Sequence, residues 1–202
     1  MAFFREFSHH HSRIFVWKFD ENDTLPPDLI EPENFYRFEN YKEKKLSEVL
    51  MVRQLLQNFL PGEKIFYQND EPFLQSGKFQ ISISHSFPFA ALAISERKIG
   101  IDLESFKPKI IRVKDKFVQR EERQFIPEDQ SVEYLTVVWS VKESLYKMHH
   151  SKHWSLKKHY EVRPFAFSDD MQISCRVHDA DFSDEYSAKV WVFDNVVLSL
   201  TF

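Results

Sequence analysis

Two carboxylates stand two residues apart at Asp102 and Glu104. On an extended segment side chains alternate between faces, so these two point the same way, while Ile101 and Leu103 point toward the core. Neighbouring carboxylates repel each other, so the pair suits either a solvated surface or a site with a cation between them. Oxygen-only ligands suit a hard ion such as Mg²⁺. The pair alone leaves both interpretations open.

A second group lies in the segment 139–147, which the apolar spacing predicts to be helical. Trp139, Glu143 and Lys147 are spaced i, i+4, i+8 and therefore share one stripe. Glu143 and Lys147 can form an ordinary surface ion pair, worth about 0.3–0.5 kcal/mol. Alternatively, Glu143 supplies a third carboxylate to a metal, with Lys147 beside it for phosphate.

A third group ends a predicted strand at Ser84, His85 and Ser86. Serine next to histidine suggests a nucleophile and its base, but adjacent strand residues face opposite ways, so the geometry of a catalytic triad is disfavoured. His85 can instead donate a hydrogen bond to an anionic phosphate.

Elements that can position these residues follow from the periodicity of apolar side chains. The spacing predicts a long helix over 41–60, ended by Pro61 and Gly62, and short strands after it. The same order then recurs, which predicts an α+β protein of two similar halves, 1–98 and 99–202, each a long helix packed on a small antiparallel sheet. The predicted strands are 64–68, 79–84, 89–95, 160–167, 172–178, 188–193 and 196–201, the later helices are 110–126 and 132–150, and 24–32 is a loop.

Composition limits the class of protein. The chain has 202 residues, 43% of them hydrophobic, with a formal net charge of −4, so it is not a general nucleic-acid binder. Its three glycines are too few for a glycine-rich phosphate loop. The single cysteine, Cys175, excludes an internal disulfide, and we interpret it as a buried apolar side chain.

The remaining sequence signals concern location. No apolar run approaches the roughly 18 residues of a membrane span, and the segment 1–6 lacks the layout of a signal peptide. We therefore expect a cytoplasmic protein without a membrane partner.

Two histidine groups, 9–11 and 149–153, have the spacing of metal ligands. Because they lack cysteine partners, we interpret them as solvated, the first within a mobile N-terminus.

Together, the three chemical segments resemble the 4′-phosphopantetheinyl transferase superfamily, in its longer pseudo-dimeric form that activates peptide synthetases. That pattern couples a Ser-His-Ser strand end, an Ile/Val-Gly-x-Asp-x-Glu strand and a later Trp-Ser-x-Lys-Glu helix. The chain matches them at 84–86, 99–104 and 139–147, in the family's order. The resemblance runs from about 38 to 165.

The resemblance implies a reaction and its participants. The family transfers the 4′-phosphopantetheine arm of coenzyme A to a serine of an acyl or peptidyl carrier protein and releases 3′,5′-adenosine bisphosphate. By position, Asp102, Glu104 and Glu143 would hold Mg²⁺, and Lys147 would contact phosphate. Glu122 matches an acid that orients or deprotonates the serine, a role for which Glu143 is the rival. Further positions expected to contact coenzyme A are Lys44, Arg53, Ser84, His85 and Lys142.

Partners follow by the same analogy. The longer family form implies a monomer, and the basic segments 105–120 and 142–163 offer a docking face for an acidic carrier protein, although such charge runs are also typical of a solvated face. No feature indicates a nucleic-acid groove, which disfavours a third possibility, a metal-dependent phosphoesterase or nuclease.

One departure from the family pattern stands before the Ser-His-Ser strand. The family usually has Gly-Lys-Pro there, whereas this chain has Asp70, Glu71 and Pro72. An acid in place of the lysine puts one phosphate contact in doubt, and Lys78 or Lys64 is a candidate substitute. This departure keeps open an alternative function: a catalytically degenerate relative that binds carrier protein or coenzyme A without turnover.

Overall fold

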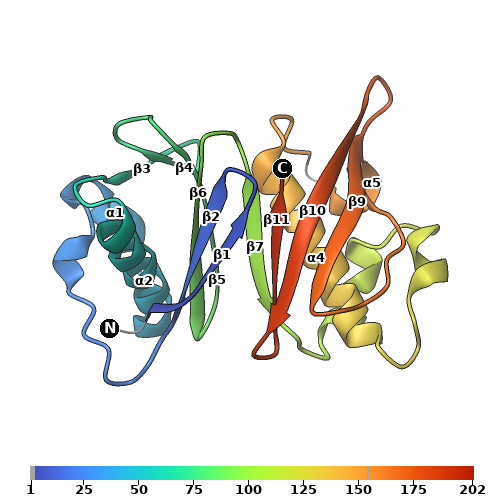
Figure 1. Ribbon diagram of the computed structural model, residues 1–202, viewed down its shortest axis with the longest axis horizontal. Helices are drawn as coiled ribbons and strands as arrows, with labels where there is room; N and C mark the ends of the chain where they lie inside the picture. The colour runs from blue at the N-terminus through green and yellow to red at the C-terminus, as the bar shows by residue number, and fades with distance from the viewer. Residues whose placement is uncertain (1–2, 154) are drawn as a thin grey trace. The chain divides into compact units, whose positions relative to one another are not determined.

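The computed structural model describes residues 3–153 and 155–202, so the first two residues of the segment 1–6 lie outside the described part. The chain forms two compact units, Met1–Lys98 and Ile99–Phe202. Each unit contains a main antiparallel sheet and one long helix, as Figure 1 shows. The predicted α+β class is confirmed.

The first unit is built on a four-stranded sheet with the order β1-β2-β6-β5. Helix α2 packs against β2 and β6 and buries Met51 and Leu55 against Phe15 and Leu92 of the sheet. This packing produces the core of the unit, since apolar side chains from one helix face and one sheet face leave water together. The bounds are β1 Phe3–His9, β2 Ser12–Lys18, α2 Glu43–Phe59, β5 Gln80–Ser86 and β6 Phe89–Ser95.

The hairpin of β1 and β2 was not predicted. The sequence interpretation placed the histidines at 9–11 in a mobile N-terminus, and this is wrong: His9 ends β1 and pairs with Ser12 across a two-residue turn. His10 takes the left-handed conformation that such turns need, with φ of 49°. The usual Asn-Gly or Asp-Gly signal is absent from this turn, so local residue types did not predict it.

The next hairpin carries a related signal. β3 (Ile65–Gln68) pairs with β4 (Glu71–Leu74) through Asn69 and Asp70, both of which have positive φ. Asparagine and aspartate tolerate this conformation better than other residues with a Cβ atom. The strand β4 was not predicted because it contains Pro72, and within sheets proline is largely confined to edge strands.

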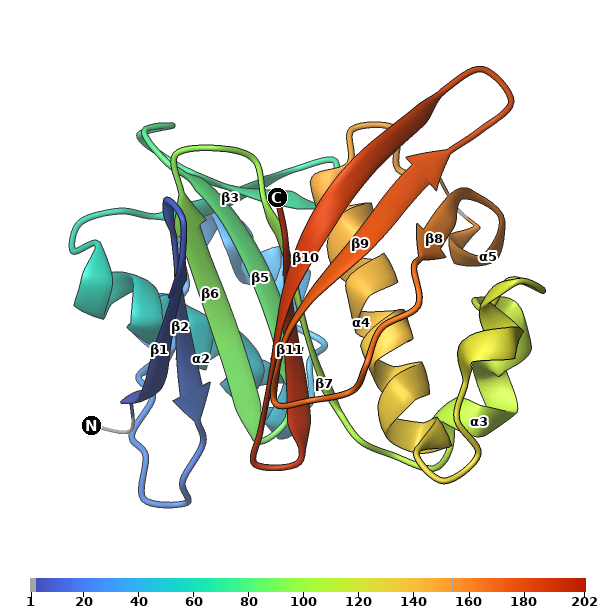
Figure 2. The same cartoon turned by 45° about the vertical axis from the view of Figure 1, so that its right-hand side comes forward.

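The second unit is built on a five-stranded antiparallel sheet with the order β7-β11-β10-β9-β8. Figure 2 shows α4 lying along this sheet, and it contacts β7, β11, β10 and β8. The core joins Val137, Val141 and Leu145 of the helix to Val190 and Val197 of the sheet. The bounds are β7 Gly100–Ser105, α4 Ser131–Met148, β8 Tyr160–Val162, β9 Asp170–His178, β10 Ser183–Phe193 and β11 Val196–Thr201.

The helix predicted over 110–126 is wrong as a continuous element. The chain there forms three short pieces, α3 (Ile110–Val113), η3 (Lys114–Lys116) and η4 (Glu122–Phe125). Side chains form hydrogen bonds with backbone groups that a continuous helix would have paired internally. Lys142 Nζ donates to Phe117 O, and Glu122 Oε2 accepts from Gln119 N. A buried ionic contact therefore interrupts the helical pattern.

The remaining elements are short. The predicted loop 24–32 contains the 3₁₀ turn η1 (Pro27–Leu29), and η2 (Pro32–Asn34) and α1 (Phe35–Phe38) follow it. Helix α5 (Leu156–His159) precedes β8. Within residues 3–153 and 155–202, none of the helices combines the length and the apolar character needed to cross a membrane.

Candidate functional site

Gly100 allows α4 to lie unusually close to β7. A Cβ atom at this position would stand 1.9 Å from Ser144 O and 2.9 Å from Met148 N, both backbone atoms of α4. The Cβ direction of Gly100 therefore faces the helix. Because strand side chains alternate, Asp102 and Glu104 face the helix as well.

Side chains of the predicted stripe on α4 contact these two acids of β7. Trp139 Nε1 donates to Glu104 Oε1 at 3.1 Å, and Lys147 Nζ lies 2.9 Å from Asp102 Oδ1. The same ammonium donates to Ile101 O at 2.9 Å. Lys147 therefore forms its ion pair with an acid of the neighbouring strand, in addition to any interaction with Glu143 along its own helix. The two halves of the predicted motif meet in one place.

The electrostatics show that the carboxylates crowd one another. Burial, followed by the nearby charges of Asp102 and Glu104, raises the pKa of Glu143 to about 7, although Lys147 opposes the shift. Burial and the Asp102 charge also raise the pKa of Glu104, against the hydrogen bond from Trp139. Lys147 and Lys107 are the two cations that act on Glu104, and against three acids they leave a surplus of negative charge when all three are ionised.

This donor set fits a divalent cation. The charge of Asp102 helps to raise the pKa of both Glu104 and Glu143, and the three side chains together form a negative site made only of oxygen donors, which is the chemistry that Mg²⁺ selects. Asp102, Glu104 and Glu143 are the residues that would hold it. Asp102 is only 5% exposed, so the first interpretation of the pair as solvated surface does not hold for it.

Glu122 and Lys142 form a separate buried ion pair. Lys142 Nζ lies 2.7 Å from Glu122 Oε2, and both side chains are buried. The other carboxylate oxygen accepts from Val162 N at 2.9 Å. Burial lowers the pKa of Lys142, and the charge of Glu122 opposes that shift. Both side chains are buried and bond to backbone groups of the segment before α4. The expected roles of Glu122 at the serine and of Lys142 at coenzyme A stay predictions.

His85 lies within a polar cluster of the first unit. Its Nδ1 is 3.2 Å from Glu48 Oε2, and its Nε2 is 3.2 Å from Lys45 Nζ. Glu48 is 7% exposed and also accepts from Phe87 N at 3.2 Å. Ser84 is buried, whereas His85 is about one-third exposed, so the two face opposite ways as predicted. The carboxylate of Glu48 therefore fixes the orientation of the imidazole.

The two basic residues predicted on α2 differ in placement. Lys44 Nζ lies over the Phe87 ring, 4.5 Å from its centre. Phe87 follows His85 closely in the sequence. Arg53 is 2% exposed and bonds to Glu31 Oε2 through Nε and Nη2 at 3.0 and 2.9 Å. The guanidinium of Arg53 is thus held in an internal ion pair, and the expectation that Arg53 contacts coenzyme A stays a prediction.

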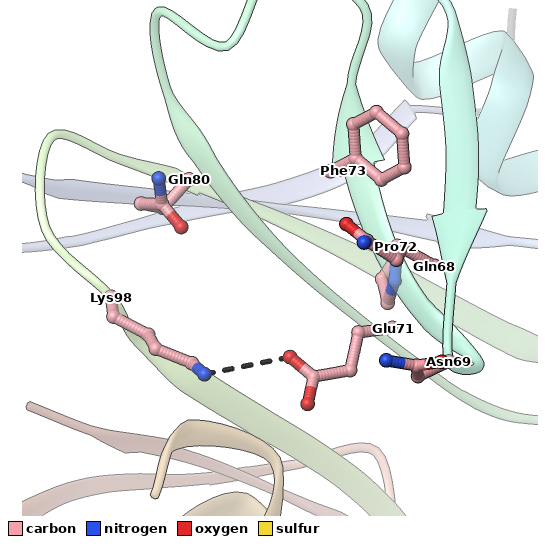
Figure 3. Close-up of a pocket in the computed structure, with 7 residues that line it drawn as sticks. All are labelled: Gln68, Asn69, Glu71, Pro72, Phe73, Gln80 and Lys98. Carbon is pink, nitrogen blue, oxygen red and sulfur yellow. Dashed lines mark hydrogen bonds and ion pairs between the residues drawn. The ribbon is translucent and has the colours of Figure 1, made fainter. Parts of the chain in front are cut away.

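Figure 3 shows the pocket beside the unusual Glu71. Lys98 Nζ reaches toward Glu71 Oε2 at 3.4 Å, so this acid has a cation beside it. The substitution of Lys78 or Lys64 for the family lysine at phosphate stays a prediction. The other residues that line the pocket are Gln68, Asn69, Pro72, Phe73 and Gln80.

Sequence reasoning missed three residues around these sites. Lys45 and Glu48 complete the cluster at His85, and their i, i+3 spacing on α2 was an available signal for a pair. Lys98 carried no local signal, because its partner Glu71 lies 27 residues away.

Comparison with known proteins agrees with this geometry. The family model of the 4′-phosphopantetheinyl transferase superfamily matches residues 98–201, which contain β7, α4 and both carboxylate segments. The chain belongs to this superfamily. It is similar to the 4′-phosphopantetheinyl transferase psf-1 of Bacillus pumilus, with 30% identity over 112 residues, 51% of this chain and 48% of the relative.

A second relative has the same enzyme name. The 4′-phosphopantetheinyl transferase gsp of Aneurinibacillus migulanus is 28% identical over 123 residues, which cover 56% of this chain and 52% of that protein. The chain thus spans about half the length of the curated relatives it matches.

Proposed function

We propose that the protein transfers the 4′-phosphopantetheine arm of coenzyme A to a serine of an acyl or peptidyl carrier protein, with Mg²⁺ as the metal. The observation that carries this proposal is the meeting of β7 and α4, where Lys147 Nζ lies 2.9 Å from Asp102 Oδ1 beside Glu104 and Glu143. Membership in the superfamily and the names of two relatives support it.

Mg²⁺, when held by Asp102, Glu104 and Glu143, would neutralise charge on the phosphate oxygens of coenzyme A. Lys147 adds a fixed positive charge at the same place, where negative charge develops during transfer. Phosphoryl transfer depends mainly on such positioning and neutralisation. The serine oxygen bonds to the phosphorus of the arm, the bond to the bridging oxygen breaks, and 3′,5′-adenosine bisphosphate leaves.

The serine proton needs an acceptor. Both carboxylate oxygens of Glu122 already accept hydrogen bonds, from Lys142 and from backbone amides. Glu143 is the rival carboxylate for this role, and it lies in the cluster that would hold the cation beside the phosphate. We therefore assign proton acceptance to Glu143 and a positioning role to Glu122.

Two further elements of the proposal concern binding. His85, oriented by Glu48, together with Lys45 and Lys44, supplies positive charge and donors for a phosphate of coenzyme A. The basic segments 105–120 and 142–163 are proposed to dock an acidic carrier protein, and the chain is proposed to act as a cytoplasmic monomer.

Mass spectrometry of apo carrier proteins tests the function. The protein is mixed with coenzyme A, Mg²⁺ and a panel of fatty-acid, polyketide and peptide carriers, and each carrier is expected to gain the mass of one pantetheine phosphate if it is a substrate. Calorimetry with the same carriers runs in parallel. Binding without any mass gain would instead support the alternative of a relative that binds and does not turn over.

A further inference from the structure

A second group of metal-ligating residue types lies in the second unit, and it shares no residue with the cluster of Asp102, Glu104 and Glu143. His153 follows α4, His159 ends α5, and Asp179 lies in the turn between β9 and β10. Each offers one ligand atom, and these atoms all lie within 4.8 Å of one another. The segment 153–159 and the turn at Asp179, 20 residues further along the chain, therefore bring two imidazoles and one carboxylate together.

The ligand atoms of this group lie close together without forming hydrogen bonds to one another. His153 Nδ1 lies 3.9 Å from Asp179 Oδ2, and His159 Nδ1 lies 3.8 Å from Asp179 Oδ1. These separations are longer than hydrogen bonds. The buried Nε2 of His153 has no hydrogen-bond partner among the described residues. The His153 and His159 rings stack with their centres 4.4 Å apart.

Neighbouring groups hold the imidazoles in place. His159 Nδ1 lies 3.1 Å from His178 O, and a proton donated there leaves the lone pair on Nε2. Metal-binding histidines commonly use this arrangement, in which the other ring nitrogen donates to a backbone carbonyl. On the other side, the Phe182 ring stacks on His153 at 5.5 Å. The orientations of both rings are thus fixed before any ion arrives.

We propose that His153, His159 and Asp179 form a second metal site, which binds a divalent transition metal of the zinc type. Two imidazole nitrogens and one carboxylate oxygen are borderline donors that suit Zn²⁺, whereas the all-oxygen cluster at Asp102 suits Mg²⁺. Water would complete the four-coordinate shell. The bound ion joins the loop after α4, α5 and the β9–β10 turn, so it stabilises this end of the unit by mass action.

The sequence interpretation took the histidines at 149–153 as solvated. His149 is 2% exposed and lies 3.3 Å from Asp184, so that interpretation is wrong for it. His150 is exposed, as expected. The ligands His159 and Asp179 come from outside this segment, which is why local spacing did not reveal the site.

Zinc titration of the full chain tests the proposal. Isothermal calorimetry with Zn²⁺ is run in excess Mg²⁺, which occupies the carboxylate site but does not compete for imidazole. The parent protein carries His10→Asn and His11→Ala, because the exposed N-terminal histidines can bind zinc by themselves. One equivalent of Zn²⁺ is expected to bind and to raise the Tm.

Single variants then locate the ion. His153→Ala and His159→Ala are expected to weaken Zn²⁺ binding about 100-fold or more, since even the loss of an outer partner costs about 10–100-fold. His150→Ala is the matched control and is expected to bind as the parent does. Co²⁺ provides a second readout, because loss of an imidazole ligand changes its visible absorption.

Asp179→Asn guards against misfolding of the histidine variants. Asparagine retains the acceptor for Ala180 N, which bonds to Asp179 Oδ1 at 2.8 Å, but it removes the charge. It is expected to weaken Zn²⁺ binding at least about tenfold with an unchanged Tm in the metal-free state. Unaltered binding in Asp179→Asn and His159→Ala, or no binding by the parent protein, would overturn the proposal.

Discussion

Lys147 Nζ and Asp102 Oδ1 lie 2.9 Å apart, although 45 residues separate them in the chain. This ion pair joins the two motif segments, because Asp102 belongs to β7 and Lys147 to α4. It holds in place a cluster whose other acids have raised pKa values. The stability and the chemistry of the site are therefore linked, and the predictions below separate the two.

Glu143→Gln is expected to stabilise the metal-free protein at high pH. The folded-state pKa of Glu143 is about 7, above the usual 4.5, so its contribution to stability is complete below pH 4.5 and is lost as the pH rises through 7. Glutamine has no such loss. We measure denaturant unfolding with a chelator at pH 5 and pH 8.5. The unfolding free energy of the variant relative to the wild type should be higher at pH 8.5 than at pH 5 by on the order of 1–3 kcal/mol. Parallel pH profiles would contradict the crowding of charges at this site.

Glu122→Gln and Lys142→Met each remove one partner of the buried pair. Loss of one partner leaves a buried charge without compensation, and we expect each variant to lose about 3–5 kcal/mol of unfolding free energy. The double variant should lose less than the sum of the two singles. Denaturant unfolding measures all three. If the double variant folds but loses transfer as completely as Glu143→Gln, the assignment of Glu122 to positioning is wrong.

Gly100→Ala tests the close approach of α4 to β7. Its Cβ would stand 1.9 Å from Ser144 O, a backbone atom, so the helix or the strand must move. We expect a loss of about 2–4 kcal/mol in unfolding free energy, together with weaker transfer, because the acids on β7 shift relative to α4. Gly77→Ala is the control: it has open space and a φ of 66°, and should cost only about 1 kcal/mol. Equal effects at the two glycines would count against the argument.

Glu48→Gln should weaken coenzyme A binding through His85. The variant loses the charged acceptor that lies 3.2 Å from His85 Nδ1, so the imidazole is less firmly oriented. A change of about 1 kcal/mol corresponds to roughly a fivefold higher KM for coenzyme A, with a smaller effect on kcat. Steady-state kinetics measures both. Glu43→Gln, at the exposed first turn of the same helix, is the matched control and should leave KM unchanged.

The sequence predicted the parts of the fold that follow from local patterns. Helix α4 and the stripe of Trp139, Glu143 and Lys147 were predicted because helical spacing fixes which side chains share a face. The orientation of Asp102 and Glu104 followed from strand alternation. These patterns carried the candidate site.

The rest depended on contacts between distant residues. Arg53 pairs with Glu31, 22 residues away, and Lys142 pairs with Glu122, 20 residues away. Spacing along one element could not reveal either partner, and the resemblance to the family was the basis for expecting both cations at coenzyme A. The broken helix at 110–126 has the same cause, since Lys142 bonds to Phe117 O within it.

The mass of an apo carrier protein tests the central claim most directly. Wild-type protein, coenzyme A and Mg²⁺ should add one pantetheine phosphate to the carrier, and a chelator should prevent the addition. Glu143→Gln, folded and in Mg²⁺, should add none. Equal mass gain by Glu143→Gln, or by the wild type in the presence of the chelator, would contradict the account.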